Sequence, residues 1–329
     1  MKIRSLLALA AVAVAAVVLA ACGSDSGSTT TGAAAPAATT AGTSAKLIVS
    51  NPDNASKPTI TIGSKNFTEE FILGNIYAQA LKAAGYHVKT QLNLGSEQIA
   101  YKALKGGQVA AYPEYTGTAL TSFYGVKPDD VPKDPQAAYE KVKAGAAKDG
   151  ITALPPTDFT DSNGFAMTQA NAQKYGITKL SDLKSKAPQL TIAGPPECRQ
   201  RTDCLLGLEQ VYGLKFKKFL PIDIAKRDEV LTNGQADVAL VFTTDGAIKT
   251  DNLALLQDDK KMLPPYNASL LVRDKVIQSA GPDLAATVAK VQGGLTTPVM
   301  QELNSRVDLD KQQPAAVATE YLKESGYLR

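Results

Sequence analysis

Hydrophobic positions switch between two spacings along the chain from residue 58 onward. Residues 58–63 alternate polar and apolar side chains and end in glycine, which predicts a first strand. Between residues 71 and 84 the apolar positions recur three and four residues apart, which predicts a helix that ends at Gly85. Apolar runs and amphipathic segments then alternate as far as residue 150. This pattern predicts an α/β fold with a parallel sheet and right-handed crossovers.

The pattern changes after Gly150. Residues 154–159 hold two prolines and read as an extended, helix-breaking segment, and a new strand is expected from Asn163. We therefore place a boundary between two lobes here. The other expected elements are strands at 87–94, 109–112, 163–167, 190–193 and 219–224, and helices at 96–105, 134–148, 203–212, 283–292, 298–307 and 314–326.

A short pattern occurs once in each half of the chain. Gly107 is followed eight positions later by Tyr115, and Gly234 is followed eight positions later by Phe242. Each unit has a helix, a glycine turn, an apolar strand and then an aromatic residue. Two such units suit two lobes that face each other across a cleft.

The strand expected at 109–112 should end at Pro113. The segment that follows is rich in tyrosine and threonine and also holds Glu114. Ligand sites in open α/β sheets lie beyond the carboxyl ends of strands. Tyrosine faces attract cations, so a pocket for a cationic ligand is expected there.

The start of the first helix carries a capping signal. Asn66 is followed three residues later by Glu69, which fits a capping box. A helix N-terminus at the mouth of the sheet presents free N–H groups and partial positive charge, which would favour an anion. Lys65 would reinforce that charge, or it is a solvated loop lysine.

The N-terminal residues form a secretory signal. Lys2 and Arg4 precede an apolar run from Leu6 to Leu19, and small residues lead to Cys22. This segment looks like a bacterial lipoprotein signal, which implies removal of residues 1–21 and acylation of Cys22. A transmembrane anchor is the alternative. The lipoprotein signal implies that the protein is exported and lipid-anchored to the outer face of the bacterial cytoplasmic membrane. The Ser/Thr/Gly/Ala-rich tract 22–57 is expected to be a flexible linker.

Composition narrows the function further. The chain has 329 residues and a formal net charge of +3, of which Lys2 and Arg4 supply two positive charges, so no concentrated basic face for nucleic acid is expected. The chain has one histidine and neither a G-x-S-x-G nor an H-E-x-x-H motif, so we expect no catalytic residue, cofactor or metal site. Cys198 and Cys204 are close in sequence, and in an oxidising compartment they are expected to form a disulfide rather than a redox or metal site.

Five segments carry a family resemblance. They are Ile62–Glu70, Tyr112–Thr118, Thr244–Gly246, Leu256–Lys260 and Pro264–Tyr266. Together they resemble the osmoprotectant-type substrate-binding proteins of ABC importers, over residues 58–329. The resemblance implies a two-lobed type II periplasmic-binding-protein fold with a ligand cleft between the lobes. Lobe I would comprise 58–160 and 244–329, and lobe II would comprise 161–243.

The same resemblance implies a site for a quaternary ammonium group inside a cage of aromatic rings. Tyr115 matches a cage tyrosine, Phe165 and Phe242 stand at two other ring positions, and Leu205 stands where a fourth ring is expected. Lys65 and Thr118 match positions that hold the carboxylate of the ligand or its equivalent. Either Arg199 or Arg201 would add a second cation there. The alternative for the rings is core packing at strand ends, which we favour for Tyr112, Tyr124 and Tyr266.

We therefore expect a monomeric solute receptor that captures a glycine betaine- or choline-type small molecule and delivers it to an ABC permease and its ATPase. Leu205 motivates an alternative, in which the same receptor takes a different polar or cationic small molecule. An exported enzyme and an adhesin or sensor lipoprotein are further hypotheses.

Overall fold

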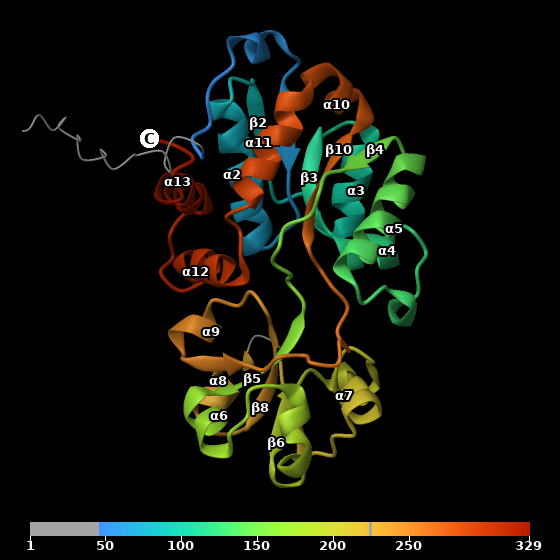
Figure 1. Ribbon diagram of the computed structural model, residues 1–329, viewed down its shortest axis with the longest axis vertical. Coiled ribbons are helices and arrows are strands. Elements are labelled where there is room, and N and C mark those ends of the chain that lie inside the picture. Colours follow the sequence, from blue (N-terminus) through green and yellow to red (C-terminus); the bar gives the residue numbers. More distant parts are fainter. Residues whose placement is uncertain (1–45, 224–225) are drawn as a thin grey trace, which may run out of the picture. The chain divides into compact units, whose positions relative to one another are not determined.

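The computed structural model describes residues 46–223 and 226–329 (Figure 1). The predicted signal peptide 1–21 and the predicted acylation at Cys22 lie outside the described residues. Part of the predicted linker is folded, because residues 46–57 contain the 3₁₀ helix η1 (Pro52–Ser56) and two anchoring hydrogen bonds. The Ile48 N–H donates to the Tyr327 carbonyl at 3.0 Å, and Asn54 Nδ2 donates to the Ala84 carbonyl at 2.9 Å. Within the described ranges, every helix is too short or too polar to cross a lipid bilayer.

The first lobe is built on a five-stranded sheet with the order β2-β1-β3-β10-β4. Its strands are β1 (Ile60–Gly63), β2 (Val88–Gln91), β3 (Ala111–Tyr115), β4 (Ile151–Ala153) and β10 (Ala268–Arg273). β1 runs parallel to β2 and β3, whereas β10 runs antiparallel to β3 and β4. The prediction of a parallel sheet is therefore wrong at β10, because the chain reaches this strand on its return from the second lobe and not through a crossover helix.

Strand β3 continues through Pro113, where the sequence pattern predicted its end. The Thr116 N–H donates to Asn267 and the Arg273 N–H donates to Ala110, which fixes the register between β3 and β10. In this antiparallel register Pro113 is opposite Leu270 at a position whose backbone nitrogen faces away from β10. The missing N–H of proline therefore costs no hydrogen bond to β10.

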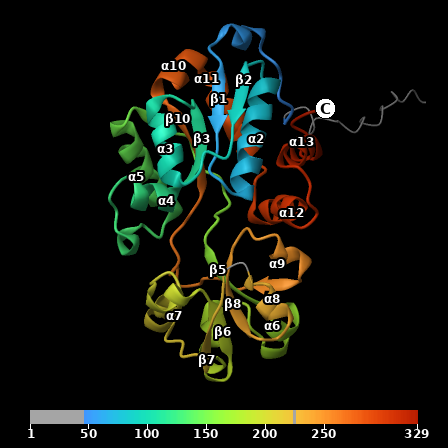
Figure 2. The same ribbon diagram turned by 180° about the vertical axis from the view of Figure 1, so that it is seen from behind.

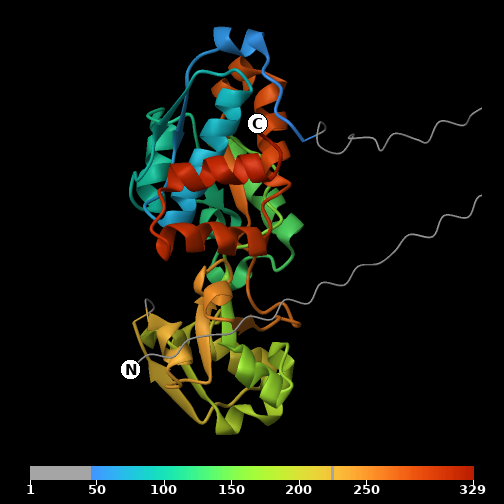
Figure 3. The same ribbon diagram turned by 90° about the vertical axis from the view of Figure 1, so that its left-hand side faces the viewer.

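Helices cover both faces of the first sheet (Figures 1 and 2). One face carries α2 (Thr68–Ala83), α10 (Asp274–Ala280), α11 (Pro282–Gln292), α12 (Thr297–Asp308) and α13 (Pro314–Glu324). The other carries α3 (Glu97–Gly106), α4 (Thr116–Ser122), the 3₁₀ helix η2 (Pro128–Asp130) and α5 (Pro135–Lys148). Figure 3 shows α12 and α13, in red, side by side on this lobe.

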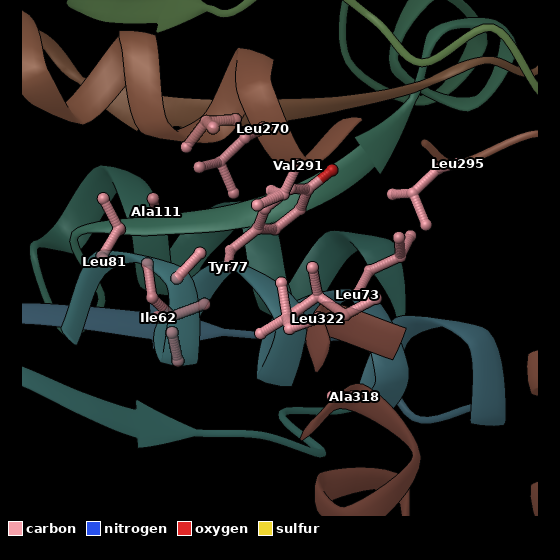
Figure 4. Close-up of a cluster of buried hydrophobic side chains, with 14 of the residues drawn as sticks. Ile62, Leu73, Tyr77, Leu81, Ala111, Leu270, Val291, Leu295, Ala318 and Leu322 are labelled. Carbon is pink, nitrogen blue, oxygen red and sulfur yellow. The ribbon is translucent and has the colours of Figure 1, made fainter. Parts of the chain in front are cut away.

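Alternate residues of the central strand enter two separate hydrophobic cores. Ala111 and Tyr115 join the core under α2, and Tyr112 joins the core under α3, α4 and α5. Figure 4 shows Leu73 and Tyr77 of α2 among Leu270 of β10 and Leu322 of α13. Each fully buried side chain of this size stabilises the fold by roughly 1.5–3 kcal/mol relative to exposure.

The second lobe repeats the arrangement of the first. Its sheet has the order β7-β6-β8-β5-β9, with β6 parallel to β7 and β8, and with β5 antiparallel to β8 and β9. The strands are β5 (Asn163–Thr168), β6 (Thr191–Gly194), β7 (Lys218–Pro221), β8 (Val238–Phe242) and β9 (Leu253–Leu255). Its helices are α6 (Gln169–Tyr175), η3 (Leu180–Ser185), η4 (Ala187–Gln189), η5 (Pro196–Gln200), α7 (Leu205–Tyr212), α8 (Glu229–Thr232) and α9 (Ala247–Thr250). The central strands are β3 and β8, so the sequence repeat places Tyr115 and Phe242 at the last positions of equivalent strands.

The chain passes between the two sheets twice, after β4 and after β9. The two passing segments pair with each other at Thr160 and Asn267. Strand β9 belongs to the second sheet, although the predicted boundary at residue 243 put it in lobe I. Leu256 and Met262 also pack in a core of the second lobe, so the return to the first lobe follows Met262.

Candidate ligand-binding site

A cavity of about 610 Å³, the main cavity, is lined by residues of both lobes. The first lobe contributes the β1–α2 loop, the start of α3, the end of β3, α4 and α12. The second lobe contributes the start of β5, the loop before α7 and the segment after β8, and the chain between the lobes adds Asp161 and Tyr266. This volume lies in the range of roughly 300–1,000 Å³ that is usual for sites of small molecules.

Four aromatic rings line the main cavity: Phe67, Tyr115, Phe242 and Tyr266. The ring of Phe67 stacks on that of Tyr115 with centroids 6.1 Å apart and an angle of 25° between the planes. Tyr266 lies directly over Gly117, because a Cβ on that glycine would come within 2.7 Å of the tyrosine ring. The rings therefore hold fixed positions from which their π faces can contact a cation.

Lys65 is buried at the end of β1 and is surrounded by acidic groups. Its Nζ lies 2.5 Å from Glu114 Oε1, 3.6 Å from Glu70 Oε1 and 4.4 Å from the centroid of the Tyr115 ring. Burial lowers the pKa of Lys65, but the charges of Glu114 and Glu70 outweigh burial and raise the pKa above its ordinary value. The ammonium group is therefore charged and already paired within the protein.

Glu114 is held by three donors. Its Oε1 accepts from Lys65 Nζ and from the Tyr115 N–H at 2.8 Å, and its Oε2 accepts from the Tyr112 hydroxyl at 2.9 Å. This carboxylate fixes the end of β3, so it positions Tyr115 and does not itself line the cavity.

Helix α2 begins later than the capping signal predicted. Its N-cap is Phe67, which is extended and makes no side-chain cap, so the capping box of Asn66 and Glu69 is wrong. The carboxylate that returns to the backbone is Glu70, whose Oε2 accepts the Lys65 N–H at 2.9 Å. Because the helix begins only at Thr68, Phe67 is extended and lines the cavity, and Glu69 lies in the first turn of the helix.

Glu69 joins three elements at the base of the cavity. Its Oε1 accepts from the Tyr115 hydroxyl at 2.7 Å, and its Oε2 accepts from Asn304 Nδ2 of α12 at 2.8 Å. Asn304 Nδ2 also donates to the Thr244 carbonyl at 3.0 Å. Burial, together with the nearby charge of Asp161, raises the pKa of Glu69 to about 8. Burial likewise raises the pKa of Asp161, which accepts from the Thr244 hydroxyl at 2.9 Å, to about 6.

Ion pairs fix the residues of the second lobe. Arg227 Nε and Nη2 donate to the two carboxylate oxygens of Asp245, both at 2.6 Å, and Asp245 Oδ2 accepts the Phe242 N–H at 2.8 Å. Arg201 Nε donates to Asp203 Oδ1 at 2.8 Å, and Asn163 Nδ2 donates to Asp203 Oδ2 at 3.0 Å. Arg201 and Asp203 belong to the disulfide loop, which is residues 198–204 closed by the predicted Cys198–Cys204 bond.

The structure brings Lys65, Tyr115, Thr118 and Phe242 together at the main cavity. Of the two candidate arginines, Arg201 lines the cavity, whereas the Arg199 guanidinium lies 4.4 Å from the centroid of the Phe219 ring. Two predicted cage positions do not line the cavity. Phe165 is fully buried in the second lobe, and Leu205 packs against the same core at the start of α7.

Sequence reasoning missed the other two rings and the buried acids. Phe67 is inside the Ile62–Glu70 segment, directly before helix α2. This apolar residue remains 39% exposed, so one face of its ring is free. Tyr266 follows two prolines in the segment that returns to the first lobe, where its ring packs against the core under α2, as we favoured from the sequence, and also lines the cavity. These two locations are the signals from which the rings could have been inferred.

Comparison with known proteins agrees with this geometry. Residues 58–324 match the family described as the substrate-binding domain of the ABC-type glycine betaine transport system. A carnitine transport binding protein of Listeria monocytogenes is 35% identical over 277 residues, which cover 83% of this chain and 89% of that protein. A glycine-betaine-binding protein of Pseudomonas aeruginosa is 36% identical over 284 residues, which cover 82% and 89%.

Solved structures show the same architecture. The crystal structure of a glycine betaine/carnitine/choline ABC transporter protein matches with a TM-score of 0.76 at 29% identity, over 82% of this chain and 99% of that one. Ligand-free YehZ of Escherichia coli matches with a TM-score of 0.75 at 28% identity, over 82% and 99%. The predicted two-lobed α/β fold is confirmed. The chain belongs to the family of substrate-binding domains of ABC-type glycine betaine transport systems.

Proposed function

We propose that this substrate-binding protein captures a quaternary amine of the glycine betaine, choline or carnitine type in the main cavity. The observation that carries the proposal is the lining, which among the described residues combines four aromatic rings with six carboxyl side chains and two cationic ones. The carboxylates belong to Glu69, Glu97, Asp161, Asp203, Asp245 and Asp308. Such a lining favours a cation that is too bulky and too weakly hydrated to need direct hydrogen bonds.

The proposed cage consists of Phe67, Tyr115, Phe242 and Tyr266. Phe67 and Tyr266 take the place of Phe165 and Leu205, which lie away from the cavity. A cation over one such ring gains ~0.5–1 kcal/mol when exposed and ~2 or more when desolvated. Four rings would therefore account for specific binding without an ion pair to the ammonium group.

For a short zwitterionic ligand such as glycine betaine, we propose that Lys65, Thr118 and Arg201 contact the carboxylate. Lys65 and Arg201 are each paired with a carboxylate in the protein, so a ligand carboxylate would share these cations with Glu114 and Asp203. The hydroxyl of Thr118 adds a neutral donor in α4.

The relatives are named for carnitine and for glycine betaine, and the importer role supplies the partners. We propose that the receptor is lipid-anchored through Cys22 and delivers its ligand to the ABC permease and ATPase. The alternative is the same receptor role for another polar or cationic small molecule, because two of the four rings are phenylalanine.

A thermal-shift panel tests the proposal. The purified protein is heated with glycine betaine, choline, carnitine or ergothioneine, and with the neutral isostere 3,3-dimethylbutanol as the control for shape without charge. A ligand at about 100 times its Kd adds ~2.7 kcal/mol of stability, which raises Tm by roughly 5 °C for a chain of this size. We expect such a shift with quaternary amines and none with the isostere. Equal shifts for choline and the isostere, or no shift with any quaternary amine, would refute the proposed ligand class.

A further inference from the structure

A second cavity of about 380 Å³, the side cavity, adjoins the main cavity. The two cavities share Arg201, Asp203 and Tyr266 as lining residues. The outer wall of the side cavity is formed by Thr121, Asp129 and Lys133 of the first lobe. Tyr266 and the Arg201–Asp203 pair therefore border both spaces.

The disulfide loop forms the opposite wall, to which its residues 200–203 all contribute. The Cys198–Cys204 bond closes this loop, and both cysteines are fully buried. Helix α7 supports the loop from behind at Gly207, where a Cβ would come within 1.9 Å of the Thr202 carbonyl oxygen. The wall is therefore held covalently and by packing.

Among the described residues, the charged groups of the side cavity leave the ammonium of Lys133 without a close partner. Asp129 accepts the Thr202 hydroxyl, and Asp203 accepts from Arg201 and Asn163. Lys133 is partly buried and makes no hydrogen bond or ion pair with residues 46–223 or 226–329. Burial lowers the pKa of Lys133, and the more distant charges of Asp203, Asp258 and Asp129 only partly oppose this. An anion beside Lys133 would supply the partner that the protein does not.

We propose that the side cavity is a subsite for the carboxylate of an extended zwitterion whose trimethylammonium group lies among the four rings, and that Lys133 binds this carboxylate. This inference rests on the proposed function and narrows its ligand class. Glycine betaine has one methylene between its charges, so its carboxylate stays beside the rings. Homologues with three or four methylenes would extend the carboxylate past Tyr266 toward Lys133, which lines the same side cavity as Tyr266.

Titration calorimetry with a homologous series tests the proposal. The ligands are trimethylammonio carboxylates with one, two, three and four methylenes, together with choline, which carries no anion. We expect the affinity of the unmodified protein to rise along the series by about tenfold, the effect of one hydrogen bond to a charged group. Lys133→Met should remove this rise and leave glycine betaine and choline binding unchanged.

Two further variants serve as controls. Lys127→Met removes an exposed lysine from the same connecting segment and should leave the rise intact, and Lys133→Arg should preserve it. The proposal is overturned if the rise persists in Lys133→Met, if affinity does not rise along the series in the unmodified protein, or if Lys133→Met weakens choline as much as the long zwitterions. Absence of binding by every ligand, choline and glycine betaine included, would instead refute the proposed function and this inference with it.

Discussion

Tyr115 connects the hydrophobic core of the first lobe to the main cavity. The residue is only 3% exposed, the centroid of its ring lies 4.4 Å from Lys65 Nζ, and its hydroxyl donates to Glu69 at 2.7 Å. The backbone N–H of the same residue is bonded to Glu114. A single side chain thus contributes packing, a π face and a hydrogen bond to a buried acid.

We expect Tyr115→Ala to weaken quaternary-amine binding by tenfold or more, because a desolvated cation–ring contact contributes ~2 kcal/mol or more. The truncation also leaves a cavity in the core, which should lower the free energy of unfolding by ~3–5 kcal/mol. Titration calorimetry and urea unfolding of the same preparation measure the two effects.

Tyr115→Phe separates these contributions. It keeps the ring and removes the hydroxyl that bonds Glu69, so affinity should change little while stability falls by ~1–3 kcal/mol. If phenylalanine and alanine weaken binding equally, the π face of residue 115 does not hold the ligand.

At the scale of single residues, the sequence could identify some site residues but not whether their side chains face the cavity or the core. Tyr115 and Phe242 were predictable because each follows a glycine by the same interval and ends a central strand. Phe165 is paired with Leu240 inside the second sheet, so its ring enters the core, and that register is not readable from aromatic content. Phe67 and Tyr266 depend on the exact start of α2 and on the path between the lobes.

At the scale of elements, helix α12 of the first lobe contacts the segment that follows β8. Gln301 Nε2 donates to the Thr243 carbonyl at 2.8 Å, and Asn304 Nδ2 donates to the Thr244 carbonyl at 3.0 Å. Gly246 permits this approach, because a Cβ there would lie 2.6 Å from Ser305 Cα. The contact places Asn304 where it also binds Glu69.

We therefore expect Gly246→Ala to push α12 away and to lower the free energy of unfolding by ~1–3 kcal/mol, as overpacking does. Urea unfolding measures the change. Gly293→Ala is the matched control. The atom nearest to the added Cβ at this position is 3.6 Å away, so the position should tolerate a methyl group. Equal stability of Gly246→Ala and the unmodified protein would show that this approach is not tight.

Most elements were predictable from hydrophobic spacing, whereas their pairing was not. Helices α5 and α11 lie within one residue of the ranges expected from their apolar periodicity and their boundary residues. The apolar run of β10 reads alike whether the strand is parallel or antiparallel. Strand β9 likewise joins the second sheet because it pairs with β5, nearly 90 residues earlier in the chain. Long-range pairing therefore limited the sequence-based description at this scale.

At the scale of the whole molecule, buried acids couple proton binding to folding and to ligand binding. Burial raises the pKa of Glu69 and of Glu70 from 4.5 to about 8. The folded state therefore holds protons that the unfolded chain releases above its lower pKa. Stability from this source is full below about pH 4.5 and is lost as pH rises through about 8. Urea unfolding without ligand should show a lower free energy of unfolding at pH about 8 than at pH about 5.

Ligand binding should depend on pH in the opposite direction. Glu69 lines the main cavity, and its ionised form attracts a cation that its protonated form does not, so a bound quaternary amine favours release of the proton. We expect the affinity for choline to rise between pH about 6 and about 8, and heats measured in buffers of different ionisation enthalpy should report proton release. Choline does not titrate in this interval, so the change belongs to the protein. Glu69→Gln remains neutral throughout and should reduce both the rise in affinity and the proton release. If the affinity of the unmodified protein is flat or falls as pH rises, Glu69 does not interact with the ligand. The charge of the bound quaternary amine would then be balanced by other lining residues, Asp245, Asp308 or Glu97.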